Sequence, residues 1–123
     1  GLPDMAVPIR YALGWPERRR TDESYFDLAR FGSPTFEAPD LDRFPALAAG
    51  FEAARLGGTA GAVVNAANEV AVAAFLRGEL SFGGISIAVT SALEKLELVE
   101  QPTLEEVLEA DAWARREAAL CCS

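Results

Sequence analysis

Three polar side chains interrupt an otherwise apolar stretch of the sequence, and they are its best candidates for chemistry. Asn65, Asn68 and Glu69 stand three and four residues apart, which places them on one face of a helix. A carboxylate beside two carboxamides could ligate a metal ion, or act as a general base while the amides position a substrate. This interpretation predicts a carboxylate-dependent metal enzyme.

A structural interpretation of the same side chains competes with it. Buried polar side chains need hydrogen-bond partners, and each one left unpaired costs about 1–3 kcal/mol. The three side chains could bond to loop backbone and fix how their helix meets a neighbouring segment or domain. Carboxylate sites in helical bundles use several inward acids together with His, and this sequence has no His. We therefore favour the structural interpretation and expect no catalytic or metal-binding residue.

The charge balance argues against a nucleic-acid partner. The 123 residues include 11 Lys and Arg against 19 Asp and Glu, a net charge of −8. Phosphate backbones are bound by clustered basic residues, which this chain largely lacks. The one basic run, Arg18-Arg19-Arg20, is followed closely by acidic residues and is interpreted as a solvated loop.

Cysteine usage and hydropathy bear on the compartment. Cys121 and Cys122 are adjacent, a spacing that disfavours a disulfide between them and supplies too few ligands for a zinc site. The pair fits a reducing cytoplasm. The sequence shows no charged-then-apolar leader, and its longest apolar stretch, residues 60–76, is interrupted by polar side chains. We therefore expect no signal peptide and no membrane-spanning segment.

Residues 1–42 and 43–123 differ in character and are predicted to be separate parts. The first part holds five of the seven prolines, so we expect an irregular arm with one short helix over residues 8–13. Thr35-Phe36-Glu37 is strand-like but is bracketed by prolines, which allows at most an edge strand within residues 33–39.

The second part is predicted to begin with two helices. Asp42 can cap the first helix, which ends at Gly57-Gly58. Its apolar residues recur on one face: Phe44, Leu47, Phe51 and Ala54. The second helix, residues 60–77, is predicted to end at Gly78. It is apolar nearly all round, which is typical of a buried central helix.

Two further helices complete the second part. Ser81 or Gly84 opens the third, whose inner side is expected to carry Ile85, Ala88, Val89, Ala92, Leu93 and Leu96. The fourth begins at Pro102-Thr103, where Thr103 and Glu106 have the spacing of a capping box. Short connections make an antiparallel four-helix bundle the expected architecture, and the fold class is mainly α.

Trp113 lies on a mostly charged face of the predicted fourth helix. Long polar side chains could cover its partly exposed ring. The ring could equally be a docking contact with another domain, since aromatic residues are enriched at interfaces. The sequence leaves both interpretations open.

Several strings, read in order along the chain, match a pattern found in one enzyme family. The most specific are Pro3-Asp4-Met5 and Asn65-Ala66-Ala67-Asn68-Glu69. The others are Tyr11-Ala12-Leu13, Trp15-Pro16-Glu17-Arg18, Phe36-Glu37-Ala38-Pro39-Asp40 and Asp111-Ala112-Trp113-Ala114-Arg115. Together they resemble the C-terminal region of 1-deoxy-D-xylulose 5-phosphate reductoisomerases, over the whole length of the chain.

The resemblance implies a parent enzyme that converts 1-deoxy-D-xylulose 5-phosphate to 2-C-methyl-D-erythritol 4-phosphate in isoprenoid precursor biosynthesis. It implies NADPH and Mg or Mn as cofactors, and a cytoplasmic homodimer with upstream NADPH-binding and catalytic domains. This chain would then be a C-terminal fragment, catalytically incomplete alone and without a cofactor of its own. Residues 1–42 would be the tail of the catalytic domain and a linker arm, and residues 43–123 the helical domain.

The resemblance also implies roles for individual residues. Pro3 and Met5 would lie near the nicotinamide, and Asn65, Asn68, Glu69 and Trp113 would hold the helical domain against the catalytic domain. The chain departs from the family where Ala6-Val7 replaces the usual Arg-Thr, because Val7 cannot cap a helix as Thr can. Residues 19–30 depart as well. The alternative to this family role is a self-standing helical module that binds another protein.

Overall fold

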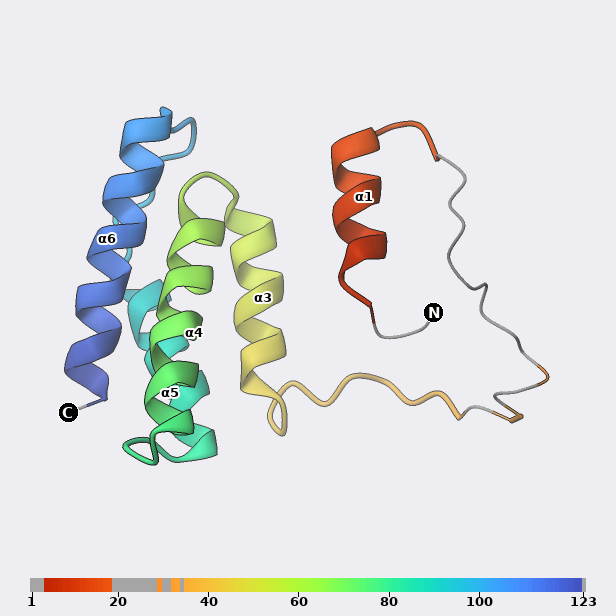
Figure 1. Cartoon of the computed structure of the whole chain (residues 1–123), viewed down its shortest axis with the longest axis horizontal. Coiled ribbons are helices and arrows are strands. Elements are labelled where there is room, and N and C mark those ends of the chain that lie inside the picture. The colour runs from red at the N-terminus through yellow and green to blue at the C-terminus, as the bar shows by residue number, and fades with distance from the viewer. Residues whose placement is uncertain (1–3, 19–28, 30–31, 34, 123) are drawn as a thin grey trace. The chain divides into compact units, whose positions relative to one another are not determined.

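The computed structural model describes residues 4–18, 29, 32–33 and 35–122. The chain forms two compact units, Gly1–Glu37 and Ala38–Ser123. Its described elements are all helices: α1 (Ala6–Gly14), α3 (Pro45–Leu56), α4 (Ala60–Leu76), α5 (Phe82–Glu94) and α6 (Leu104–Cys121) (Figure 1). The predicted mainly α fold class is confirmed. None of the described helices is long and apolar enough to cross a membrane.

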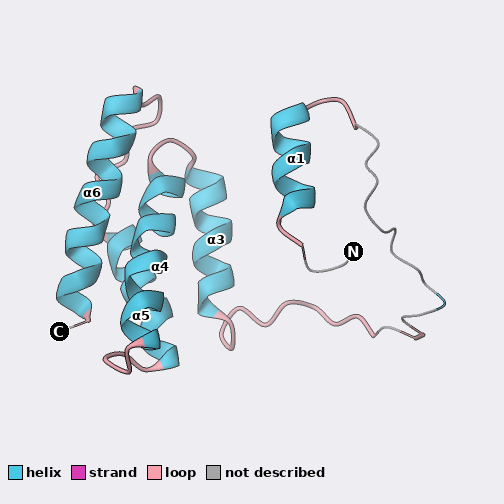
Figure 2. Ribbon diagram, viewed as in Figure 1, coloured by secondary structure: helices cyan, strands magenta, loops and turns pink. Residues whose placement is uncertain are grey.

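The predicted edge strand is wrong for the residues that the structure describes. The backbone of residues 35–40 forms no strand, and Figure 2 shows loop through this segment. A strand needs a hydrogen-bonded neighbouring strand, and no other described segment pairs with residues 35–40. Pro34 lies outside the described residues.

Helix α1 is confirmed and begins two residues earlier than predicted. The Asp4 carboxylate accepts a hydrogen bond from the Ala6 amide at 2.9 Å, which satisfies a donor at the helix start. Asp4 thus provides a side-chain hydrogen-bond acceptor at the start of α1, which Val7 has no polar atom to provide. Tyr11 and Trp15 meet edge-to-face at 5.5 Å, and the Arg18 guanidinium lies 4.6 Å from the Tyr11 ring centre. No residue of α1 is buried.

Helix α3 differs from the prediction in the residue at which it starts and in the face that it buries. Its first residue is Pro45, which suits the first turn because that position needs no amide donor. Asp42 does not cap it: Asp40 instead closes the preceding turn, accepting from the Arg43 amide at 2.9 Å. The helix buries Ala49 and Ala53, whereas the predicted apolar face of Phe44, Leu47, Phe51 and Ala54 is exposed.

Helix α4 is the centre of the second unit, as predicted. It packs against α3, α5 and α6, and α5 also contacts α3 and α6, while α3 and α6 do not touch. Figure 1 shows α4 lying between α3 and α6. The helix ends at Arg77 and Gly78, whose φ of 77° is the left-handed conformation that glycine adopts readily.

The predicted caps of α5 and α6 are confirmed. Ser81 accepts a hydrogen bond from the Gly84 amide at 3.2 Å, so Ser81 rather than Gly84 opens α5. At α6, the Thr103 hydroxyl accepts from the Glu106 amide at 3.3 Å, and the Glu106 carboxylate accepts from the Thr103 amide at 2.7 Å. The reciprocal pair is a complete capping box.

The core of the bundle is built from small side chains. Its buried cluster is Ala49, Val63, Ala66, Ala67, Val89, Ala92, Ala114 and Ala118. Alanines at the crossings let the helix axes approach closely. The larger inner residues of the predicted third helix are only half-buried: Leu93 and Leu96 pack around the cluster, and Ile85 is not part of it.

Candidate functional site

An ion-pair network joins the middle of α4 to the second half of α6. The Arg115 guanidinium donates to the Glu69 carboxylate through Nη2 at 2.8 Å. The same guanidinium donates to Asp111, one turn earlier on α6, from Nε at 2.8 Å and from Nη2 at 3.2 Å. One arginine therefore clamps an acid of its own helix and an acid 46 residues away.

The two asparagines of the predicted stripe have different surroundings. The Asn65 amide donates to the Glu69 carboxylate at 3.0 Å along α4. Asn68 is exposed, and its side chain makes no hydrogen bond to the described part of the chain. The three residues share a helix face as predicted, but their partners are side chains of α4 and α6 rather than loop backbone. All three are exposed rather than buried.

The network favours the charged forms of Glu69 and Arg115. The Arg115 hydrogen bond first, and then that of Asn65, hold the pKa of the Glu69 carboxyl below its ordinary value. Asp111 and Glu69 in turn raise the pKa of the Arg115 guanidinium. A carboxylate that is kept ionised, with both oxygens engaged, is poorly suited to accept a proton as a general base. The arrangement instead ties α4 to α6.

The described residues do not fit a metal site. Among them, no group of three or more His, Cys, Asp or Glu residues is placed to hold an ion. Divalent cations such as Mg²⁺ require several oxygen ligands in a near-octahedral arrangement. The oxygens of Glu69 and Asp111 already accept hydrogen bonds from Arg115, so no chemical step through a metal is assigned to this part of the chain.

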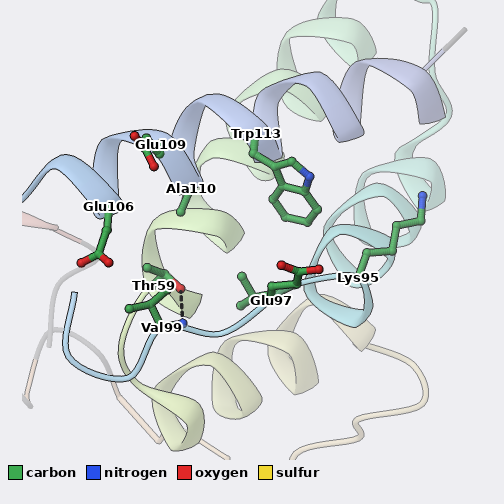
Figure 3. Close-up of a pocket in the computed structure, with 9 residues that line it drawn as sticks. Thr59, Lys95, Glu97, Val99, Glu106, Glu109, Ala110 and Trp113 are labelled. Atoms are coloured by element: carbon green, nitrogen blue, oxygen red, sulfur yellow. Dashed lines mark hydrogen bonds between the residues drawn. The ribbon is translucent and has the colours of Figure 1, made fainter. Parts of the chain in front are cut away.

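Trp113 lines a groove between α6 and the segment that leads into it. The groove has a volume of about 340 Å³ and is bounded by Thr59, Lys95, Leu96, Glu97, Val99, Glu106, Glu109, Ala110 and Trp113. Figure 3 shows the Trp113 indole pointing from α6 toward the segment that carries Glu97. The Lys95 ammonium is held outside by Glu117 at 3.0 Å, so the uncompensated charges at the rim are acidic.

Trp113 takes part in the packing of the bundle, although most of its neighbours on the same face of α6 are charged. The side chain is half-buried and packs against the alanine-rich core cluster. Its ring is therefore a wall of the groove as well as part of the bundle's packing, not merely an aromatic covered by long polar side chains. The apolar wall and acidic rim suit an apolar group with a neighbouring positive charge.

The floor of this groove is a fixed connection between two distant segments. The Thr59 amide donates to the Val99 carbonyl at 3.1 Å, and the Val99 amide donates to the Thr59 hydroxyl at 3.2 Å. The Thr59 side chain is buried. The start of α4 is thus paired with the segment before α6, a contact that sequence spacing gave no means of anticipating.

The predicted cofactor residues lie in the first unit. Pro3 is outside the described residues, and Met5 precedes α1 with 71% of its surface exposed. Met5 offers one flexible apolar contact to a ring system. Arg115 is the important residue that sequence reasoning did not single out. The i, i+4 spacing of Asp111 and Arg115 was the available signal, but it points along α6 and not toward Glu69.

Comparisons with known proteins bear on what this arrangement belongs to. The profile of the family described as DXP reductoisomerase C-terminal domain matches residues 1–117. Reductoisomerases of Pelotomaculum thermopropionicum and Chlorobium limicola are 54% and 49% identical over 115 and 118 residues. These matches cover 94% and 96% of this chain but only 30% and 31% of the relatives. The chain thus spans about a third of their length.

Solved structures give the same pattern. The Zymomonas mobilis reductoisomerase in complex with NADPH matches all of this chain and 32% of that chain, with 41% identity and a TM-score of 0.73. A DOX-P reductoisomerase in complex with magnesium matches 99% of this chain and 33% of that chain, with 36% identity and a TM-score of 0.72. The helical arrangement described above is therefore shared with those proteins.

Proposed function

Because the chain belongs to the family of DXP reductoisomerase C-terminal domains, we propose that it serves as the C-terminal region of a 1-deoxy-D-xylulose 5-phosphate reductoisomerase. One observation carries the proposal: the family profile matches residues 1–117, almost the whole chain. The high identity to relatives named as this enzyme supports it. The whole enzyme would produce 2-C-methyl-D-erythritol 4-phosphate for isoprenoid precursors.

In this proposal the chemistry takes place upstream of the chain. NADPH would supply the hydride and a divalent metal, Mg or Mn, would polarise the substrate oxygens. The metal ligands and most of the nucleotide contacts would come from the NADPH-binding and catalytic domains. The working assembly would be a homodimer in the cytoplasm, where the free thiols of Cys121 and Cys122 stay reduced.

The contribution of this chain would be to support and position those domains. Residues 1–42 would complete the catalytic domain and link it to the bundle of residues 43–123. Pro3 and Met5 would lie beside the nicotinamide, where the flexible Met5 side chain could pack on the ring. Arg115 would act only on the bundle itself, by keeping α4 and α6 in register.

Four residues of the bundle would meet the catalytic domain. Asn68 has an exposed and unpaired amide, which leaves its donors and acceptor available to another domain. Asn65 and Glu69 are already engaged with each other and with Arg115, so they would present a preorganised polar surface beside it. Trp113 would offer the apolar wall of its groove to a side chain of that domain.

A chimeric enzyme tests the proposal. The upstream domains of the Pelotomaculum thermopropionicum reductoisomerase are joined to this chain in place of the matching region. NADPH oxidation is then measured with 1-deoxy-D-xylulose 5-phosphate and magnesium or manganese. We expect activity from the chimera, and none from this chain alone. The proposal fails if the folded chimera is no more active than the upstream domains by themselves, or if this chain alone is active.

A further inference from the structure

Helix α3 points its largest apolar side chains away from the bundle. Its buried face consists of Ala49 and Ala53. Phe44, Leu47 and Phe51 follow one another at helical spacing on the outer side, and they are 54%, 41% and 57% exposed. A helix normally turns its large apolar residues toward a packed partner. In the second unit, the partner of this stripe is missing among the described residues.

The start of α5 extends the same apolar surface. Phe82 is 78% exposed and meets Phe75 of α4 edge-to-face, with ring centres 5.8 Å apart. A groove of about 560 Å³ runs between the two helices, lined by Phe44 and Leu47 on one side and by Phe82 and Ile85 on the other. Phe44, Leu47, Phe51, Phe82 and this groove together are called the α3–α5 face.

The charge of the α3–α5 face differs from that of the rest of the chain. The chain carries a net charge of −8, yet the charged residues that line the groove are one acid and one base, Asp42 and Arg43. The Arg43 guanidinium lies 5.5 Å from the Phe44 ring centre. A locally neutral groove with aromatic walls fits an apolar protein surface better than it fits a charged small molecule.

The α3–α5 face has more to gain from being covered than the polar face of α4. Glu69 and Asn65 already have partners, so covering them adds few new interactions. Single exposed apolar residues are common on proteins, but a contiguous apolar patch of this kind usually marks an interaction site. Three aromatic rings and a leucine left in water form such a patch.

The length of the relatives suggests which part of the protein covers the α3–α5 face. This chain covers only 30% and 31% of the two relatives compared above, so more than two-thirds of each relative lies outside the matched region. We propose that the catalytic part of the reductoisomerase packs onto the α3–α5 face, with an apolar segment of that part seated in the groove. This inference rests on the proposed function and adds to it a second, apolar contact surface, separate from the polar residues of α4 and from Trp113.

Thiol labelling tests which face is covered. In a background of Cys121→Ser and Cys122→Ser, a single cysteine is introduced by Phe51→Cys on the α3–α5 face or by Ile87→Cys farther along α5. Ile87 is the control, because it is 68% exposed against 57% for Phe51 and belongs neither to the α3–α5 face nor to the residues proposed to meet the catalytic domain. The rate of reaction with a maleimide is measured for each variant, in this chain alone and in the chimera with the upstream domains.

We expect the Phe51→Cys thiol to react at least about tenfold more slowly in the chimera than in the free chain, because burial excludes the reagent. The Ile87→Cys thiol should change by less than about twofold. Equal rates for the Phe51→Cys thiol in the two proteins would overturn the inference. The readout does not depend on activity, so a protected thiol in an inactive chimera would count against the proposed function alone.

Two other occupants give distinct results in the free chain. If a second copy covers the face, protection of the Phe51→Cys thiol appears in the free chain and increases with its concentration. If residues 1–37 of the same chain cover it, protection is present in the free chain at every concentration. Either result would overturn the assignment to the catalytic part.

Discussion

Thr59 and Val99 exchange two hydrogen bonds across 40 residues of sequence, one through the backbone and one through the threonine hydroxyl. The pair joins the first turn of α4 to the segment that delivers α6. Since α4 contacts every other helix of the second unit, the geometry of this one junction affects the packing of the whole bundle.

Gly58→Ala should strongly destabilise the bundle. Gly58 has a φ of 51°, and a Cβ built there would lie 2.1 Å from the Val99 carbonyl oxygen. The backbone strain alone costs about 1–3 kcal/mol, and the junction must also move. We expect a loss of about 2–4 kcal/mol in the free energy of unfolding, measured by urea denaturation. Gly50→Ala is the control: nothing lies within 4 Å, and an alanine inside α3 should stabilise by about 0.5–1 kcal/mol.

Thr59→Val tests the hydroxyl of the junction. The substitution keeps the shape of the buried side chain but leaves the Val99 amide without its acceptor. An unpaired buried donor costs about 1–3 kcal/mol, and because Val99 is half-buried we expect a fall in unfolding free energy near the lower end, about 1 kcal/mol. Thr59→Ser retains the hydroxyl and should lose less. A larger loss for Thr59→Ser than for Thr59→Val would show that the methyl group, not the hydrogen bond, matters at this position.

Glu69→Gln should change how the stability of the bundle depends on pH. The Arg115 and Asn65 hydrogen bonds lower the pKa of the Glu69 carboxyl below its ordinary value. A carboxyl whose pKa is depressed by folding stabilises the folded state above the unfolded pKa, and this stabilisation is lost as the pH falls through the folded pKa. Thermal melts between pH 7 and pH 3 should therefore fall less steeply for Glu69→Gln than for the natural sequence. If the slopes are identical, the network contributes nothing to acid stability.

The control for this pH prediction is Glu97→Gln. Glu97 lies at the Trp113 groove and makes no hydrogen bond to the described residues. Its substitution removes the same formal charge without touching the Arg115 network. We expect its melting temperature to fall with decreasing pH as steeply as that of the natural sequence.

Thr103→Ala should weaken the start of α6 by a predictable amount. The variant removes one half of the capping box, the acceptor for the Glu106 amide. Loss of an N-cap of this type costs about 1 kcal/mol, and hydrogen exchange should quicken in the first turn of α6. Thr35→Ala, at an exposed position outside any helix, should leave the unfolding free energy unchanged to within about 0.5 kcal/mol. A Thr103→Ala variant as stable as Thr35→Ala would contradict the role of the cap.

The sequence predicted the helices that are governed by short-range rules. The capping box at Thr103 and Glu106, the serine cap of α5 and the glycine end of α4 were all anticipated, because each depends on residues three or four apart. The central position of α4 also followed from its composition, since a helix that is apolar nearly all round must be surrounded. Asp42 failed as a cap because Pro45 and the Asp40 turn determine where α3 begins.

The sequence by itself determined which residues form helices and that Asn65, Asn68 and Glu69 share one face, since helical periodicity is local. Only the tertiary structure decided what those faces meet. Glu69 finds its cation 46 residues away on α6, a distance that periodicity does not encode. The apolar stripe of α3 was visible in the sequence, but periodicity cannot tell which face is packed. Close helix packing buries Ala49 and Ala53 instead and leaves Phe51 exposed, because small side chains let neighbouring helices approach where a phenylalanine would hold them apart.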